Sequence, residues 1–199
     1  NIVTKFYSSD GEIIKTFTAY TFSKIDIADV PDDFIHALIA TEDKNFYKHK
    51  GYDITGLARS TVQNILAGHV VQGASTITQQ LARILFLSNE RTFDRKIKEL
   101  MVAASIEKTI SKDKILEMYV NNVYLGSGAY GVEAAAETYF NKKLKNCTLP
   151  ELALIAGLPQ APSVYSPFNN MKLAVQRRNQ VLGRMYKMKY ITKEQYEKA

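Results

Sequence analysis

The sequence is poor in cysteine, proline and glycine, and it contains no tryptophan. Its 199 residues include one Cys, five Pro and ten Gly. A single thiol, Cys147, excludes a disulfide framework within the chain and any metal site built from several cysteines. So few Pro and Gly residues also exclude long low-complexity linkers and collagen-like repeats. No apolar run approaches the roughly 20 residues of a membrane-spanning helix.

The residues that are present are typical of a folded domain. Hydrophobic residues make up 46% and charged residues 23% of the chain, and this length suits one domain or a domain with a small second lobe. The net charge is +6, and residues 172–198 alone carry this surplus. A basic segment suits nucleic acid, anionic lipid or a phosphorylated substrate, but it is equally typical of a solvated helix face. Because the chain begins with Asn1 instead of Met, we expect it to be a piece of a longer protein.

The hydrophobic pattern predicts a mainly α-helical domain with a small β element at its N-terminus. Apolar residues flank a Ser-Ser-Asp-Gly turn at 8–11, which is typical of two paired strands. Beyond this region the apolar spacing is helical almost throughout. We therefore expect a strand pair and linker over 1–25 and one helical domain over 26–199. Helices are expected to begin near residues 31, 54, 76, 92, 111, 132, 148, 171 and 192, the second of them covering 54–66, with a loop over 68–73.

Two adjacent carboxylates stand at the end of the first expected helix. Glu42 and Asp43 open the sequence Glu-Asp-Lys-Asn-Phe-Tyr-Lys-His-Lys-Gly, which also contains Phe46 and His49. A carboxylate at a helix C-terminus faces the negative end of the helix dipole, which raises its pKa and makes it a better base. Acidic pairs are also common on protein surfaces, so this pattern alone favours a solvated helix end.

A second cluster gathers hydroxyl and amide side chains at an expected helix start. It is the sequence Gly-Ala-Ser-Thr-Ile-Thr-Gln-Gln-Leu, which begins at residue 73. The free N–H groups and positive dipole of a helix N-terminus suit a phosphate or a sugar hydroxyl. A capping box explains Thr76 and Gln79 but leaves Ser75, Thr78 and Gln80 unexplained.

A third group combines two cations with a carboxylate. Arg95 and Lys96 precede Glu99 by four and three residues, so all three share one helix face. They form either a surface salt bridge, worth well under ~1 kcal/mol, or a cationic clamp for a diphosphate beside a carboxylate. The apolar stripe expected to be buried on the same helix is Ile97, Leu100, Met101 and Ala104.

Five blocks in this order closely resemble the peptidoglycan glycosyltransferases of family 51, the glycan-polymerising domain of bifunctional penicillin-binding proteins. The fourth block is Ile-Leu-Glu-Met-Tyr-Val-Asn, ending at Asn121, which is either a helix C-cap or a site residue. The fifth is Arg-Arg-Asn-Gln-Val-Leu-Gly-Arg-Met, so the resemblance spans residues 42–185. One departure is that Arg83 and Ile84 stand where the family usually has Lys-Asn. Arg83 keeps the charge, but its planar fork contacts a phosphate differently from an ammonium.

The resemblance implies a lysozyme-like fold with a mainly α large lobe, a smaller membrane-proximal lobe and a long cleft between them. It further implies that residues 26–199 polymerise lipid II into β-1,4-linked glycan strands. The growing lipid-linked glycan would be the donor and lipid II the acceptor. The acceptor's GlcNAc 4-hydroxyl would attack the MurNAc anomeric carbon with inversion, releasing undecaprenyl diphosphate.

The resemblance also assigns two catalytic residues. Glu42 matches the base that takes a proton from the sugar hydroxyl, a poor nucleophile near neutral pH. Glu99 matches the family's second glutamate, which either aids departure of the diphosphate, with a divalent cation (Mg²⁺ or Mn²⁺) as an option, or orients Lys96. No other cofactor and no resident metal site are implied. The residues expected to bind substrate are Asp43, Phe46, His49, Ser75, Thr76, Gln79, Gln80, Arg83, Arg95, Lys96 and Asn121.

The expected surroundings follow from the same resemblance. The chain would work at the outer face of the bacterial cytoplasmic membrane, with an anchor segment before it and a transpeptidase domain after it. The loop around Val70 and Val71 is a candidate for lipid contact. Moenomycin, a phosphoglycolipid that resembles the elongating donor, is the expected inhibitor, and nucleic acid is not an expected partner.

Two other functions stay open at this point. A lysozyme-like hydrolase or lytic transglycosylase shares the fold and a catalytic glutamate, but a cleaved glycosidic bond has no diphosphate for the cations to neutralise. A non-catalytic basic module that binds membranes or nucleic acid would use residues 172–198 and leave the Ser, Thr and Gln cluster without a purpose.

Overall fold

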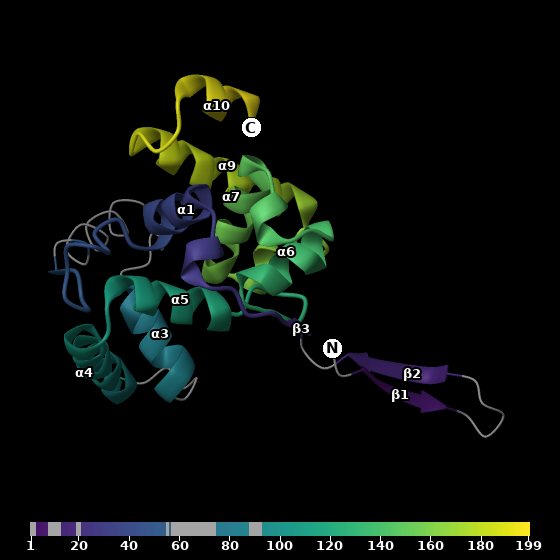
Figure 1. Ribbon diagram of the computed structural model, residues 1–199, viewed down its shortest axis with the longest axis horizontal. Helices are drawn as coiled ribbons and strands as arrows, with labels where there is room; N and C mark the ends of the chain where they lie inside the picture. Colours follow the sequence, from purple (N-terminus) through teal and green to yellow (C-terminus); the bar gives the residue numbers. More distant parts are fainter. Residues whose placement is uncertain (1–2, 8–12, 19–20, 55, 57–74, 88–92) are drawn as a thin grey trace.

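The chain folds into a mainly α-helical structure with a β-hairpin at its N-terminal end (Figure 1), as the hydrophobic pattern predicted. The computed structural model describes residues 3–7, 13–18, 21–54, 56, 75–87 and 93–199. The predicted turn at 8–11, most of the helix over 54–66 and the loop over 68–73, with Val70 and Val71, lie outside these residues. The helices are α1 (Asp32–Glu42), α3 (Ile77–Phe86), α4 (Phe93–Thr109), α5 (Lys112–Asn122), α6 (Val132–Phe140), α7 (Leu149–Gly157), α8 (Pro162–Tyr165), α9 (Met171–Lys187) and α10 (Lys193–Lys198). The described part of the chain also contains the short 3-10 helices η1 (Ile27–Asp29), η2 (Leu144–Asn146) and η3 (Leu158–Gln160).

Several helices begin where capping residues predicted. The Thr76 hydroxyl accepts a hydrogen bond from the Gln79 N–H at 3.1 Å, and the Gln79 side chain accepts from the Thr76 N–H at 3.2 Å. Thr192 and Gln195 form the same kind of box at α10, and the Ser111 hydroxyl accepts from the Lys114 N–H at the start of α5. Such caps satisfy N–H groups that have no partner within the helix, which is why these starts were readable from sequence.

The main core forms where α7 packs against α1 and α9. α7 is apolar on nearly all sides, and residues Leu152 to Gly157 are all buried, as expected for a helix at the centre of a domain. Phe34 and Leu38 of α1 and Val181 of α9 are also almost completely buried. This packing brings the C-terminal end of α1 against α9.

A second group of helices is formed by α3, α4 and α5, with α3 in contact with both neighbours. The predicted apolar stripe of α4 is wrong, because Ile97 and Met101 are 43% and 67% exposed. The residues of α4 that are buried instead are Glu99, Ala103 and Ile106. Hydrophobic spacing misassigned this face because α4 turns a charged residue inward, where it is paired. Among the described residues, no helix is long and apolar enough to cross a membrane.

Among the described residues, the N-terminal segment contributes the strands β1, β2 and β3. β1 (Val3–Tyr7) and β2 (Ile13–Thr18) are antiparallel and project from the helical body (Figure 1). β3 (Thr21–Phe22) pairs in parallel with β4 (Ala129–Tyr130), a contact too short to leave a sequence pattern. The Asn121 side chain then holds Ile25, accepting from its N–H and donating to its carbonyl, each at 2.8 Å. The domain boundary near residue 25 stays a prediction.

Candidate active site

Glu42 is the last residue of α1, and its side chain is only 11% exposed. Gln80 Nε2 donates a hydrogen bond to Glu42 Oε2 at 3.0 Å, and Arg177 Nη2 lies 3.6 Å from Oε1. Burial raises the pKa of the Glu42 carboxyl, although Gln80, Arg177 and Arg184 oppose this shift. The sequence predicted a raised pKa from the helix dipole, whereas the structure assigns burial as the main cause. A carboxylate of this kind is suited to accept a proton near neutral pH.

Asp43, Phe46 and His49 lie behind Glu42 in the interior. Asp43 Oδ2 accepts hydrogen bonds from His49 Nε2 at 2.8 Å and from the Ile77 N–H at 3.0 Å. His49 Nδ1 accepts from the Gly51 N–H at 3.1 Å. Phe46 is completely buried. The structure therefore does not bring these three side chains to a surface that a substrate could touch, and instead they join α1 to the start of α3.

A cationic cluster stands at the N-terminal end of α3. Lys96 Nζ donates to Ser75 Oγ at 2.9 Å and to Gln79 Oε1 at 3.5 Å. The carboxylate of Glu99 is completely buried and forms ion pairs with both Lys96 and Arg95. The predicted shared face of these three charges is confirmed. Two cations face the one Glu99 carboxylate at the positive end of the α3 dipole, and this arrangement suits an anion.

The first turn of α3 connects Glu42 to this cationic cluster. Gln79 binds Lys96 and the adjacent Gln80 binds Glu42. Thr76 and Gln79 also form the capping box, so capping and a site role are not alternatives for Gln79. The Thr76 hydroxyl is buried and donates to the Gly51 carbonyl at 2.8 Å. Of the three residues that capping does not explain, Ser75 contacts Lys96 and Gln80 contacts Glu42, whereas the Thr78 hydroxyl donates to Glu107 Oε1 at 2.6 Å.

Two predicted site residues lie apart from both groups. Asn121 is buried against Ile25, and its Nδ2 also donates to the Glu117 carbonyl at 2.8 Å, so its contacts are structural. Arg83 is half-buried one turn along α3, where its charge favours ionisation of Tyr119. The structure therefore brings Asn121 to neither the carboxylate nor the cations.

Sequence reasoning did not assign Arg177, Arg184 or Tyr119 to the site. Arg177 is buried, donates from Nε to the Gly157 carbonyl at 3.0 Å, and faces Glu42. Arg184 Nη1 donates to the Thr41 carbonyl at 3.0 Å. Both arginines belong to the fifth sequence block, and this block was the feature of the sequence that could have pointed to them. Their partners, Glu42 and the Thr41 carbonyl, lie more than 130 residues away in sequence, so only tertiary packing could identify them.

A bound metal does not fit the described part of the site. No three His, Cys, Asp or Glu side chains among the described residues are grouped so that they could hold a metal ion. The Glu99 oxygens are each taken by a cation, which leaves this carboxylate poorly suited to a divalent ion.

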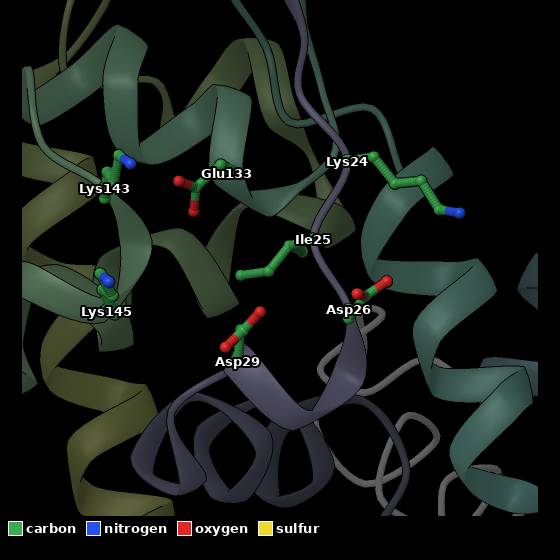
Figure 2. A pocket seen from close by; sticks show the side chains of 7 residues that line it. All are labelled: Lys24, Ile25, Asp26, Asp29, Glu133, Lys143 and Lys145. Atoms are coloured by element: carbon green, nitrogen blue, oxygen red, sulfur yellow. The ribbon is translucent and has the colours of Figure 1, made fainter.

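A separate pocket of about 370 Å³ lies beside the N-terminal segment (Figure 2). It contains none of the predicted site residues. Because carboxylates and lysines are interleaved around it, its lining favours no ligand of a single charge. The lining residues are Lys24, Ile25, Asp26, Asp29, Glu133, Lys143 and Lys145.

Comparison with known proteins points to one family. A family model described as Transglycosylase matches residues 10–186. Penicillin-binding protein 1A from Pseudomonas aeruginosa is 48% identical over the whole chain, and that from Escherichia coli K12 is 49% identical. The protein of the same name from Aquifex aeolicus is 50% identical over 98% of the chain.

The match covers only part of each relative. The chain spans 24%, 23% and 27% of the Pseudomonas, Escherichia and Aquifex proteins, or about a quarter of their length. The crystal structure of penicillin-binding protein 1A from Haemophilus influenzae matches with a TM-score of 0.58 at 30% identity. That match covers 98% of this chain and 19% of the solved one.

Proposed function

We propose that this chain, which belongs to the transglycosylase family and is a peptidoglycan glycosyltransferase, polymerises lipid II into β-1,4-linked glycan strands. The observation that carries the proposal is the first turn of α3, where Gln80 holds Glu42 and Gln79 contacts Lys96. A base and a cationic cluster on the two sides of one helix end suit a reaction in which a hydroxyl attacks and a diphosphate leaves.

In this mechanism Glu42 is the base. It accepts the proton of the acceptor's GlcNAc 4-hydroxyl while the hydroxyl oxygen forms a bond to C1 of the donor MurNAc. The bond from C1 to the diphosphate breaks at the same time, and undecaprenyl diphosphate leaves with the electron pair. Attack opposite the leaving group inverts the anomeric carbon and gives the β linkage. Glu42 then releases the proton to water.

Arg95 and Lys96 stabilise the leaving group in the same mechanism. Negative charge develops on the diphosphate as the bond breaks, and fixed cations stabilise this charge more in the transition state than in the ground state. Glu99 holds both cations at the end of α3, which supports its orienting role. A lysozyme-like hydrolase has no diphosphate for such a cluster, so these contacts favour the glycosyltransferase.

Exposed apolar side chains on two neighbouring helices, α3 and α4, support a location at the membrane. Phe86 of α3 and Met101 of α4 are 62% and 67% exposed, and Ile97 is also exposed. Exposed apolar side chains on neighbouring helices are typical of a membrane or protein contact. We infer that these side chains contact the outer surface of the cytoplasmic membrane. The anchor and a C-terminal transpeptidase domain would belong to the rest of the full-length protein. This chain matches only 24% of the Pseudomonas relative, so about three quarters of that protein lies outside the match.

The direct test is the product formed from labelled lipid II. We expect long glycan strands, separable by gel electrophoresis, that a muramidase digests to disaccharide units. Short fragments released from added glycan, with no growth on lipid II, would instead identify a hydrolase. Absence of either product in a folded protein that binds lipid vesicles would identify a non-catalytic module.

Moenomycin binding provides a second test, because this phosphoglycolipid is expected to occupy the donor position. Its phosphate would lie at the Ser75 end of α3 beside Arg95 and Lys96, with dipole and charge-assisted hydrogen bonds. Displacement of a fluorescent moenomycin should therefore give weaker binding for Lys96→Met than for wild type. Binding should also weaken as salt rises, though less than at an exposed patch. Lys98→Met, which removes an exposed lysine of the same helix, is the matched control.

No binding by the wild-type protein would contradict the proposed donor site. Equal binding by wild type and Lys96→Met would remove Lys96 from the cluster that holds the phosphate.

A further inference from the structure

Tyr119 of α5 is completely buried directly behind the Glu42–Gln80 pair. Its hydroxyl donates a hydrogen bond to Gln80 Oε1 at 3.0 Å, and Gln80 Nε2 donates to Glu42 Oε2 at 3.0 Å. A chain of hydrogen bonds thus runs from α5 through α3 to α1. We propose that Tyr119 is a positioning residue, which acts on Glu42 by fixing the end of the Gln80 amide that faces the carboxylate.

The physical basis is the asymmetry of the amide group. A glutamine side chain has an oxygen that only accepts and a nitrogen that only donates, while the two ends are nearly equal in size. Turning the Gln80 amide around would leave the Tyr119 O–H without an acceptor in a buried position. An unpaired buried donor disfavours any arrangement that creates it. Tyr119 therefore keeps Nε2 directed at Glu42.

This orientation affects the protonation of the base. The groups that face Glu42 are Arg177 and Arg184 from α9, Gln80 from α3 and Tyr119 from α5, together with its neighbour Asp43. Burial raises the pKa of Glu42, and the Gln80 hydrogen bond is the largest of the opposing influences. If the amide could turn, its oxygen would accept the proton of a neutral Glu42 acid, and the pKa would rise further.

Tyr119 is itself a stable donor. Burial raises the pKa of its hydroxyl well above the ordinary value, and the nearby Glu42 and Asp43 charges add to this shift. Arg83 opposes it without reversing it. The hydroxyl therefore keeps its proton at any pH at which the enzyme works.

The test replaces only the hydroxyl, with Tyr119→Phe. We expect the pKa of Glu42, followed by ¹³C NMR of labelled glutamate carboxyls without substrate, to rise by roughly 0.5 to 1 pH unit, the equivalent of one ordinary hydrogen bond. Glu42→Gln identifies the signal by its disappearance. The acidic limb of the kcat/KM–pH profile for polymerisation, which also reports the free enzyme, should move upward by the same amount. KM should not change, because Tyr119 has no surface for a substrate.

Two further variants separate positioning from packing. Tyr139→Phe removes another hydroxyl, which donates to the Leu125 carbonyl at 2.8 Å, and it should leave the pKa of Glu42 and the pH profile unchanged. Gln80→Met removes the amide, so this single variant should already raise the pKa of Glu42. In the double variant with Tyr119→Phe the pKa should shift no further.

An unchanged pKa of Glu42 in Tyr119→Phe would overturn the proposal. If that variant did not fold, an unchanged pKa in Gln80→Met would do the same, and so would a Tyr119→Phe shift that persists without Gln80. The inference rests on the proposed function only through the role of Glu42 as base. Because the NMR titration needs no substrate, an observed shift in a protein that makes no polymer would count against the proposed function and not against the positioning role.

Discussion

A protein in which Glu42 is replaced by glutamine is expected to lose polymerisation activity by roughly 10²- to 10⁴-fold, the usual contribution of a positioned base. The amide has nearly the same shape and can still contact Gln80 and Arg177, but it cannot accept the proton of the sugar hydroxyl. The loss should therefore appear in kcat, with KM for lipid II little changed. Initial rates of strand formation at saturating lipid II measure this effect.

The same substitution should not destabilise the fold. Burial raises the pKa of Glu42 in the folded protein, so the folded state binds this proton more tightly than the unfolded state. Stability contributed by the protonated group is then lost as pH rises from the unfolded value through the folded one. Near neutral pH a neutral amide avoids that loss, and Glu42→Gln should unfold at a temperature no lower than wild type.

Glu137→Gln is the matched control, because it removes an exposed carboxylate on α6 and should retain full activity. Near wild-type strand formation by a folded Glu42→Gln protein would show that another group takes the proton.

Lys96→Met is expected to slow use of the donor by roughly 30- to 1,000-fold. The loss of one fixed cation beside a developing negative charge corresponds to about 2–4 kcal/mol of transition-state stabilisation. The diphosphate that leaves belongs to the donor, so acceptor binding should change much less. Separately supplied donor and acceptor analogues, one varied while the other is saturating, distinguish the two.

Lys98→Met again serves as the control, since it removes an exposed charge from α4 and should have no comparable effect. If Lys96→Met reduced use of both substrates slightly and equally, the Lys96–Glu99 contact would be a structural salt bridge and nothing more.

Local rules explain which parts of this protein were predictable from sequence. The starts of α3, α5 and α10 depend on capping residues within three positions of one another, so their sequence signal is complete. The shared face of Arg95, Lys96 and Glu99 follows from helix geometry alone. The family resemblance rests on the same kind of short, ordered blocks, and it identified Glu42 without any knowledge of its surroundings.

Burial of charged groups was not predictable in this way. Hydrophobic spacing placed Ile97 and Met101 of α4 inside, whereas the buried side of the helix includes Glu99. A carboxylate is buried at this position because Arg95 and Lys96 both pair with it. A hydropathy pattern does not account for such ion-pair partners. The resemblance likewise placed Phe46 and Asn121 among the substrate-binding residues because they share blocks with site residues, whereas in the structure both side chains are buried in structural contacts.

The sequence by itself determined the helical class of the protein, its family and the identity of its proposed base, because each depends on residues close together in the chain. Only the tertiary structure decided how that base is tuned. Arg177 reaches Glu42 across the packing of α1, α7 and α9, and Tyr119 reaches it through Gln80. These contacts join residues 38 to 135 positions apart, and they form only because burial of the apolar faces of the helices brings their polar side chains together.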